Sequence, residues 1–334
     1  MKDLLSLGLD ELQSIIVGLG EKPFAAKQLA SWLAKGAVFA NMTNLSKGLR
    51  EKLAASYCEG YASIIEKHES RDGTVKYLMA MSGGDRVECV VMRYHHGSTL
   101  CVSTQVGCRM GCAFCASGAD GLVRNLTSGE MRSQFIAAEQ SANISNVVLM
   151  GSGEPLDNYE NVVAFIRALN TQHGIGIRHI SLSTCGLVPQ IERLAEEGMQ
   201  VTLCLSLHSA IDEKRKRIMP VANAYPVADI IESANNYFKK TGRRIIIEYT
   251  LIRGFNDGAQ DIEALANVLR GLNCHINVIP LNETDGDYLP PTSKQAHIFA
   301  AAMEQRGKSA SVRRSLGGDI EGACGQLKRK REET

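Results

Sequence analysis

The 334-residue sequence lacks any run of about 18 apolar residues, so it predicts no transmembrane helix and no membrane partner. Its start, Met1-Lys2-Asp3, leads into no apolar signal segment, which argues against secretion. The net charge is only +1, which excludes a uniformly basic nucleic-acid-binding protein. The 44% apolar and 22% charged residues are typical of a globular fold. We therefore expect a cytoplasmic protein.

Positive charge is nevertheless concentrated in short runs. These runs lie at residues 214–217, 239–240, 243–244 and 328–331. A single run of this kind usually forms a solvated helix face or a frayed tail. Because several occur in one near-neutral chain, a localised phosphate-binding face is an equally good interpretation.

Hydrophobic spacing divides the chain into four parts. Residues 1–60 have apolar side chains at helical intervals and predict a helical accessory domain. Residues 61–98 alternate apolar and polar side chains and predict a short β extension or linker. Residues 99–315 alternate strand-like and helix-like segments. Residues 316–334 read as a Gly-rich loop with a basic tail.

The long third part predicts an α/β fold. Six strand–helix units in a row imply parallel strands with right-handed crossovers. Six units are too few for an eight-fold barrel, so we expect a partial (β/α)6 barrel with ligands at the C-terminal ends of its strands. The expected strands are 100–105, 146–150, 179–183, 201–207, 244–251 and 275–280, and the expected helices are 127–142, 158–170, 188–198, 226–241, 259–272 and 293–306.

Three closely spaced cysteines are the strongest chemical signal. Cys108, Cys112 and Cys115 have a CxxxCxxC spacing directly after the first expected barrel strand. Thiolates are the usual ligands of iron–sulfur clusters. Three of them leave one iron of a four-iron cluster open to a small molecule. A structural zinc site would usually take four ligands, and the sequence has no second Cys-x-x-Cys pair. The spacing therefore favours a cluster over zinc.

Polar residues follow several of the other expected strands. Residues 150–155 read Met-Gly-Ser-Gly-Glu-Pro, where the glycines permit a close backbone approach and Glu154 can accept hydrogen bonds from an ammonium group. Ser183, the Ser206–His208 segment and Asn282 end three further strands. Each alone is an ordinary satisfied polar group. Their convergence on one barrel rim favours a ligand site.

Two sets of residues carry a resemblance to known families. A CxxxCxxC motif in a partial barrel resembles the radical S-adenosylmethionine (SAM) enzymes. The segment Asp-Ile-Glu-Gly-Ala-Cys-Gly-Gln-Leu at 319–327 resembles the D-I-x-x-A-C-G-Q-L motif of the RlmN/Cfr family of RNA adenine methyltransferases. Residues 22–53, 125–127, 153–158 and 217–220 are similar to the same family, so the resemblance covers nearly the whole chain.

The resemblance implies the cofactors and their ligands. Cys108, Cys112 and Cys115 would bind a 4Fe–4S cluster, whose open iron chelates SAM. Two SAM molecules would be used per turnover, and an external one-electron donor such as flavodoxin or ferredoxin would reduce the cluster. The residues implied to contact SAM are Gly153, Glu154, Ser183, Ser206, Leu207, His208 and Asn282.

The resemblance also implies a reaction. Cys324, which alone would read as a stray thiol, would accept a methyl group and carry it to C2 of an adenine. Cys101 would release the product by forming a transient disulfide with Cys324. Glu88, which alone would read as an exposed strand carboxylate, would take the ring proton. The implied substrates are 23S rRNA and the adenine 3′ to the anticodon in some tRNAs, with residues 1–60 and the basic runs contacting RNA.

Three alternatives remain at this point. A Cfr-type enzyme methylates C8 of adenine with the same thiols, although residues 150–158 and the N-terminal domain look closer to the C2 enzymes. A zinc-stabilised RNA-binding module would have no catalytic activity. A radical SAM activase or small-molecule enzyme would not need Cys324.

Overall fold

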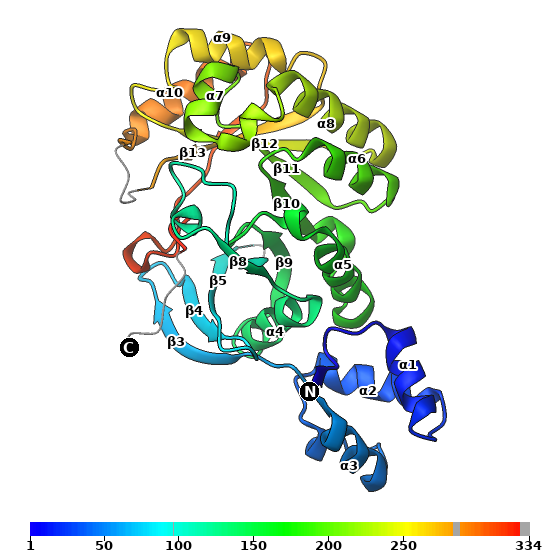
Figure 1. Ribbon diagram of the computed structural model, residues 1–334. Helices are drawn as coiled ribbons and strands as arrows, with labels where there is room; N and C mark the ends of the chain where they lie inside the picture. Colours follow the sequence, from blue (N-terminus) through cyan, green and yellow to red (C-terminus); the bar gives the residue numbers. More distant parts are fainter. Residues whose placement is uncertain (96, 283–287, 328–334) are drawn as a thin grey trace.

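Figure 1 shows the computed structural model, which describes residues 1–95, 97–282 and 288–327. The basic run expected at 328–331 lies outside these residues. Within them, no helix has both the length and the apolar character needed to cross a bilayer.

The N-terminal residues form a small helical lobe with a core of its own. Its helices are α1 (Leu9–Gly18), α2 (Phe24–Ala34) and α3 (Lys47–Ser56), and α3 begins where the Ser46 hydroxyl accepts a hydrogen bond from the Leu49 amide, at 3.1 Å. A short parallel pair, β1 (Lys2–Asp3) and β2 (Tyr57–Cys58), closes the lobe. The lobe lies beside the main body, at the lower right of Figure 1.

Helix α4 (Ser128–Glu139) joins this lobe to the main body. Ile136 of α4 packs into the lobe's own hydrophobic core. The buried guanidinium of Arg132 donates to the Leu5 carbonyl at 2.6 Å, and the Ser6 hydroxyl lies 2.9 Å from the Thr127 hydroxyl. Apolar packing together with buried hydrogen bonds fixes the position of the lobe on the barrel.

The main body is built on one large sheet. In the described residues, ten strands pair in the order β14-β13-β12-β11-β10-β9-β6-β5-β4-β3. The strands from β6 to β14 are parallel to one another, whereas β3, β4 and β5 are antiparallel. The parallel strands are β6 (Gly97–Cys101), β9 (Ile144–Leu149), β10 (Ile180–Thr184), β11 (Thr202–Ser206), β12 (Ile245–Leu251), β13 (Cys274–Pro280) and β14 (Ala310–Val312).

Helices cover the outer face of this curved sheet, as Figure 1 shows. The connecting helices are α4, α5 (Tyr159–His173), α6 (Val188–Glu196), α8 (Val227–Thr241), α9 (Ala259–Val268) and α10 (Ser293–Glu304). Apolar strand residues that face the helices form the main core, and each fully buried side chain of this kind contributes roughly 1.5–3 kcal/mol. This arrangement confirms the expected α/β partial barrel.

The segment expected as a linker is part of the sheet. Strands β3 (Ser63–Glu69), β4 (Val75–Ala80) and β5 (Arg86–Tyr94) continue the barrel sheet through antiparallel pairing of β5 with β6. Alternate residues of β5 face the barrel interior and the helices, so the extension supplies one wall of the interior.

The start of the barrel also differs from the sequence prediction. The first strand ends at Cys101, not at Gln105. Beyond it the amides of Thr104 and Gln105 donate to the Ser152 carbonyl, and residues 105–107 begin a separate hairpin of β7 (Gln105–Gly107) and β8 (Leu122–Asn125). The cysteine loop therefore connects the two strands of this hairpin and does not directly follow a barrel strand. Helix α7 (Asp212–Ile218) and strand β14 were not expected.

Candidate active site

Two adjoining cavities open at the C-terminal ends of the parallel strands. They have empty volumes of about 890 and 660 Å³ and share wall residues that include Cys115, Met150 and Cys324. The wall of the larger cavity includes Cys108, Cys112, Cys115, Gly153, Glu154, Ser183, Ser206, His208, Glu248, Asn282, Arg313 and Cys324.

The three clustered cysteines face this larger cavity together. Backbone hydrogen bonds fix their loop, with the Ala113 amide donating to the Ile218 carbonyl and the Ala116 amide to the Gly325 carbonyl, at 2.9 and 2.8 Å. Gly325 has a positive φ of 80°, and a Cβ there would lie 3.3 Å from the Phe114 carbonyl oxygen. A glycine at this position therefore lets the C-terminal loop lie directly against the cysteine loop.

The donor set consists of three thiols on one loop, and thiolates are the usual ligands of iron–sulfur clusters. Among the described residues, no three His, Cys, Asp or Glu side chains converge on one point that could hold a metal ion. Zinc needs sulfur ligands at about 2.3 Å from one centre. A four-iron cluster binds each thiolate at a different iron, so its ligands can lie further apart around a shared cavity. Burial raises the pKa of Cys108 to about 11, so this thiol stays protonated until a metal replaces the proton.

The Gly-x-Gly segment is packed against protein. A Cβ on Gly151 would lie 2.7 Å from the Ser103 amide nitrogen, and a Cβ on Gly153, whose φ is 106°, would lie 2.6 Å from Gln105 Cβ. The glycines thus let the loop after β9 lie against the chain that follows β6. Both glycines also reach the cavity wall.

Glu154 is buried, and its carboxylate accepts hydrogen bonds from two backbone amides. Its carboxylate accepts from the Cys185 amide at 2.8 Å and from the Leu156 amide at 3.1 Å. Burial raises the pKa of this carboxyl, and the hydrogen bonds from its neighbours oppose that rise. Glu154 also lines the larger cavity.

Ser183 and Ser206 meet on Glu248, a residue that sequence reasoning missed. The Ser183 hydroxyl donates to Glu248 Oε2 at 2.7 Å, and the Ser206 hydroxyl lies 3.4 Å from the same oxygen. Glu248 is buried, and Arg313 Nη1 lies 3.5 Å from its other oxygen. A lone acid in the apolar strand sequence Ile-Ile-Ile-Glu-Tyr-Thr-Leu was the signal that could have revealed it.

The side chains of Leu207 and His208 lie in different places, one in the core and one at the cavity. Leu207 packs in the main core and its side chain does not line the cavity. His208 lines the cavity with a left-handed backbone, φ 59°, and its ring meets Phe114 edge-on with centroids 4.8 Å apart. Its Nδ1 accepts from the Thr250 amide at 2.9 Å, and burial lowers its pKa to about 3, so the ring is neutral.

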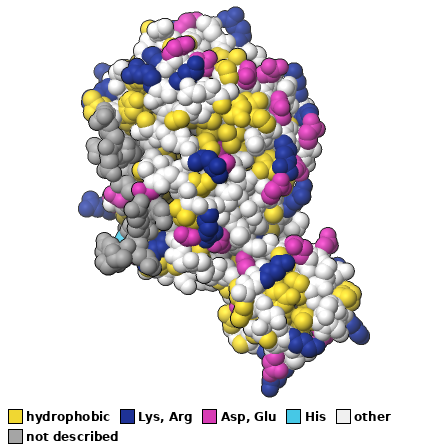
Figure 2. Space-filling view, in the orientation of Figure 1, with side chains coloured by type: hydrophobic (Ala, Val, Ile, Leu, Met, Phe, Trp, Pro, Cys, Tyr) yellow, Lys and Arg dark blue, Asp and Glu magenta, His cyan; other side chains and the backbone are white. Residues whose placement is uncertain are grey.

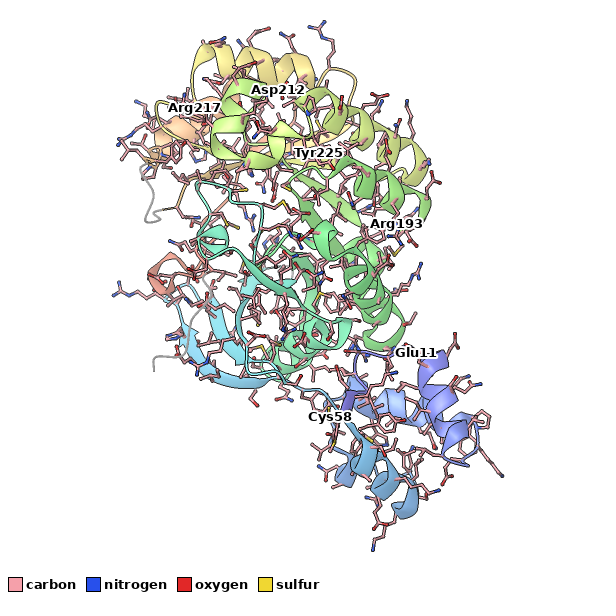
Figure 3. The ribbon with its side chains drawn as sticks, viewed as in Figure 1. Glu11, Cys58, Arg193, Asp212, Arg217 and Tyr225 are labelled. Atoms are coloured by element: carbon pink, nitrogen blue, oxygen red, sulfur yellow. The ribbon has the colours of Figure 1, made fainter. Side chains whose placement is uncertain are left out.

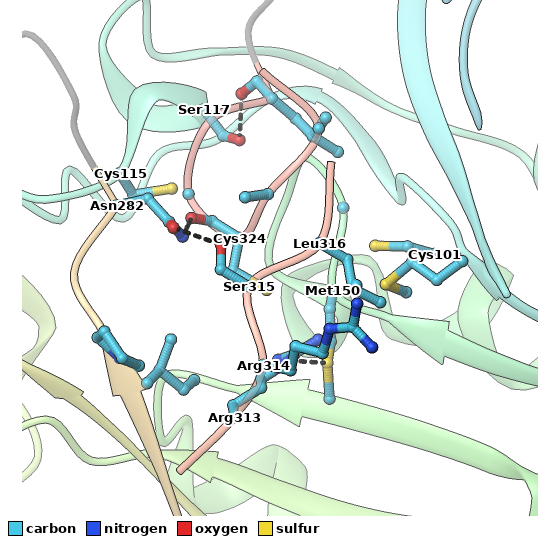
Figure 4. Close-up of a pocket in the computed structure, with 18 residues that line it drawn as sticks. Cys101, Cys115, Ser117, Met150, Asn282, Arg313, Arg314, Ser315, Leu316 and Cys324 are labelled. Atoms are coloured by element: carbon cyan, nitrogen blue, oxygen red, sulfur yellow. Dashed lines mark hydrogen bonds between the residues drawn. The ribbon is translucent and has the colours of Figure 1, made fainter. Parts of the chain in front are cut away.

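Cys101 and Cys324 reach the smaller cavity from distant parts of the chain (Figure 4). Burial raises the pKa of Cys101 to about 12 and also raises the pKa of Cys324, while Arg313 acts in the opposite direction on both thiols. Asn282 positions the loop of Cys324, because its amide donates to the Cys324 carbonyl at 2.9 Å and accepts from Ser315 at 2.8 Å. Arg313 was also missed by sequence reasoning, since it sits in an ordinary basic pair.

Glu88 lies on β5, not at an exposed position. Only 2% of its surface is accessible, and Lys76 Nζ lies 3.1 Å from its Oε1. Lys76 also donates to the Glu321 carbonyl in the C-terminal loop at 3.3 Å. Glu88 shares the face of β5 that carries Val90 and Met92, which pack with Cys101. The interpretation as an exposed carboxylate was wrong.

Several residues of the basic runs are engaged within the protein and are not free to bind phosphate. Lys214 pairs with Asp261 at 2.7 Å, Arg243 donates to the Thr202 hydroxyl at 2.6 Å, and Arg215 is fully buried. Figure 2 shows Lys and Arg side chains scattered among acidic and neutral ones on the visible face. For Arg215, both the solvated-face and the phosphate-binding interpretation were wrong.

Comparison with known proteins places this site in a class. The Radical SAM superfamily model matches residues 102–269, and the model of the ribosomal RNA large subunit methyltransferase N-terminal domain matches residues 2–58. A crystal structure of a radical SAM methyltransferase from Sphaerobacter thermophilus is 40% identical, covers 98% of this chain and 99% of its own, and has a TM-score of 0.94. Barrel and cysteine loop are those of a radical SAM enzyme.

Sequence relatives narrow the class further. Two relatives carry the name "Probable dual-specificity RNA methyltransferase RlmN". The one from Clostridium perfringens (strain 13 / Type A) is 48% identical to this chain, over 98% of this chain and 97% of the relative. The one from Clostridioides difficile (strain 630) is 47% identical, over 96% of both chains. The chain belongs to the RlmN family of radical SAM methyltransferases. The superfamily's cofactors are a 4Fe–4S cluster and SAM, and Cys108, Cys112 and Cys115 fit the cluster as described above.

Proposed function

We propose that this protein methylates C2 of an adenine in 23S rRNA and of the adenine 3′ to the anticodon in some tRNAs. One observation carries the proposal: Cys101 and Cys324, 223 positions apart in sequence, face one cavity that shares Cys115 with the cavity of the clustered cysteines. A radical SAM enzyme acting on a small molecule would have no need of this second thiol pair. The names of the sequence relatives support RNA as the substrate.

The cofactors supply what an ordinary methyltransferase lacks. When bound, the cluster and SAM provide a methyl group and a carbon-centred radical. Adenine C2 lies between two ring nitrogens and is too electron-poor to attack the methyl group of SAM, so a radical route avoids the need for a nucleophilic carbon. Cys108, Cys112 and Cys115 would hold the cluster, and the polar cavity wall with Glu154, Ser183, Ser206, His208 and Asn282 would orient SAM. One molecule of SAM would supply the methyl group, and a second would supply the radical.

The chain's own thiols then handle the methyl group. Cys324 accepts it as a nucleophile and becomes S-methylcysteine. The methyl group on Cys324 would lose one hydrogen atom to the radical that bound SAM supplies, the resulting methylene would bond to the adenine carbon, and one electron and the ring proton would then leave the adduct. Cys101 attacks the Cys324 sulfur, the carbon–sulfur bond breaks, its electron pair takes up a proton at the departing carbon to complete the methyl group, and a disulfide remains. Glu88, held on the interior face of β5, is the proposed base for the ring proton. An external donor such as flavodoxin or ferredoxin would supply electrons.

The RNA is held by parts of the chain outside the barrel. Residues 1–60 are the proposed RNA-binding accessory domain, because α4 fixes this lobe beside the barrel. The target adenine must be unpaired or extruded to reach thiols at the strand ends.

The test is anaerobic turnover of the reconstituted protein with 23S rRNA fragments or tRNA and SAM labelled in its methyl group. Mass spectrometry of nucleoside digests should show labelled 2-methyladenosine. Labelled 8-methyladenosine would instead assign a Cfr-type enzyme. A protein that purifies colourless with bound zinc and transfers no label would indicate an RNA-binding module.

A further inference from the structure

Arg215 on α7 is a fully buried guanidinium with only neutral partners. Its Nε donates to the Leu207 carbonyl at 3.0 Å, and Nη2 donates to the Cys185 and Ser206 carbonyls at 2.6 and 3.4 Å. Nη1 is buried without a hydrogen-bond partner, and no carboxylate in the described residues lies within 4.0 Å of the group. A buried charge is costly unless an opposite charge balances it. The protein chain supplies no such partner here.

The surroundings of Arg215 lie directly behind the cysteine loop. The last residue of α7, Ile218, accepts a hydrogen bond from the Ala113 amide between two of the clustered cysteines. Ile218 and Met219 pack in one apolar group with Cys112, Phe114 and Cys185. Figure 3 shows Asp212 and Arg217, which flank Arg215 on α7, at the end of the molecule that carries this helix.

Arg215 lies close enough to Cys185 and Cys112 for the ionised forms of these thiols to act on its pKa, and Cys112 would become a thiolate when it binds a metal. Cys185 and then Cys112 oppose the lowering of the Arg215 pKa by burial, and Asp212 contributes less. The Asp212 carboxylate is engaged elsewhere, because it accepts from the Val227 amide at 2.9 Å. The positive charge is thus placed beside a ligand of the cluster and not beside an acid.

We propose that Arg215 is the fixed counter-charge of the iron–sulfur cluster, favouring both its retention and its one-electron reduction. This inference rests on the proposed binding of a four-iron cluster by Cys108, Cys112 and Cys115. Such a cluster in its 2+ state, with three thiolates, carries a net charge of −1, and the single electron taken from the external donor makes it −2. No bond forms or breaks, and the guanidinium keeps its proton throughout. Arg215 is therefore a positioning residue that acts through the cluster.

The expected effect is measurable. For an effective dielectric constant of about 20 and a separation on the order of 10 Å, a unit charge changes the equilibrium for reduction by more than about ten-fold. For a one-electron couple, ten-fold corresponds to about 59 mV. Removing the charge should make the midpoint potential more negative by at least about this amount.

The experiment is a redox titration of the anaerobically reconstituted full-length protein, followed by electron paramagnetic resonance without SAM or RNA. Arg215→Gln removes the charge, and Arg215→Lys retains it with fewer hydrogen bonds. Arg132→Gln is the matched control, because Arg132 is an equally buried arginine on α4 that binds Leu5 and Gln172. We expect a negative shift for Arg215→Gln and near wild-type potentials for Arg215→Lys and Arg132→Gln.

Two results would overturn the inference. One is a wild-type potential in an iron-replete Arg215→Gln protein, and the other is an equal shift in the Gln and Lys variants, which would assign the effect to the hydrogen bonds. If the Gln variant loses its cluster, the rate of iron release to a chelator is measured for the Gln and Lys variants. Release at least ten-fold faster from Arg215→Gln than from Arg215→Lys supports a role for the positive charge in cluster retention, and equal rates contradict it. Circular dichroism checks the fold of each variant, and Arg215→Met, which keeps the side-chain volume, replaces a Gln variant that does not fold.

Failure of this inference is distinct from failure of the proposed function. A wild-type protein that binds no iron removes the basis of both. An unchanged midpoint in Arg215→Gln, with labelled 2-methyladenosine still formed by the wild type, removes only the role of Arg215.

Discussion

Cys324 and its loop are held in place by contacts with neighbouring parts of the chain. Asn282 binds its carbonyl, and Arg313 lies beside the thiol in the same cavity wall. Its loop touches the cysteine loop through the Gly325 carbonyl. At the scale of single residues, the position of this thiol is what links the barrel to the proposed methyl transfer.

The first prediction concerns this thiol. Cys324→Ala should abolish methylation of RNA, because no other residue is proposed to accept the methyl group, and should leave iron content at the wild-type level. Cys58→Ala is the control, since Cys58 lies in the N-terminal lobe (Figure 3) and lines neither cavity. Labelled nucleosides and bound iron are measured together. Methylation at normal rates by Cys324→Ala would contradict the assignment.

Glu88 gives a second prediction at this scale. Glu88→Gln keeps the shape of the side chain but removes the proposed base, so turnover should fall by about 10²–10⁴-fold. Methylation of Cys324 itself, followed by peptide mass spectrometry, should persist because that step needs no ring proton to be removed. Loss of both steps to the same degree would indicate a structural role for the Glu88–Lys76 pair instead.

Gly153 tests the packing of the segment after β9. Gly153→Ala should lower the free energy of unfolding by several kcal/mol, because it adds strain at positive φ to a clash with Gln105. Gly174→Ala is the matched control. Its φ is 72°, but a Cβ there would meet nothing within 4 Å, so its cost should stay near about 1–2 kcal/mol. Equal melting temperatures of the two variants would contradict the close approach.

At the scale of elements, the antiparallel strands hold the loop of Cys324. Asp319 accepts from the Ser70 hydroxyl at 2.5 Å and from the Arg71 amide at 3.3 Å, and the Gly317 amide donates to Asp72 at 2.9 Å. All three partners belong to the connection between β3 and β4. The extension that the sequence suggested as a linker therefore supports the part of the chain that carries a proposed catalytic thiol.

His173 at the end of α5 gives a pH prediction for the junction with the N-terminal lobe. Burial and the nearby Arg132 lower its pKa to about 3, so it folds as the neutral form. In the unfolded chain, the His173 ring takes up a proton near pH 6.5. Its contribution to the free energy of unfolding is therefore fully present above about pH 6.5 and is lost as pH falls toward 3. His173→Asn should therefore show a shallower loss of stability over that range in urea unfolding. His297→Asn, at an exposed position on α10, is the control for the substitution itself.

At the scale of the whole molecule, strand and helix periodicity was enough to predict the barrel. The strands from β9 to β13 lie within a few residues of their expected positions, because buried parallel strands are continuous apolar runs. The hairpin β7–β8 and helix α7 were not predictable, since short elements are stabilised by tertiary contacts more than by their own pattern. Arg215 shows this most clearly: a run of four basic residues gave no sign that one of them is buried.

The candidate site was partly predictable for a similar reason. Cysteine spacing and strand-end polar residues are enough to predict a ligand cavity, since the ends of parallel strands meet at one rim. That Cys101 and Cys324 line one cavity could not come from spacing, because the C-terminal loop reaches this cavity by long-range packing on β5 and β6. Only the resemblance to a family suggested it.

The central claim is that Cys101 and Cys324 act as a pair on RNA beside a radical SAM cluster. Its most direct test is anaerobic turnover of Cys101→Ala with RNA and SAM, followed by denaturing gel electrophoresis and peptide mass spectrometry. The account predicts a covalent RNA–protein adduct at Cys324 and little free product, because the thiol that releases the base is missing. Free 2-methyladenosine formed at the wild-type rate, with no adduct, would contradict it.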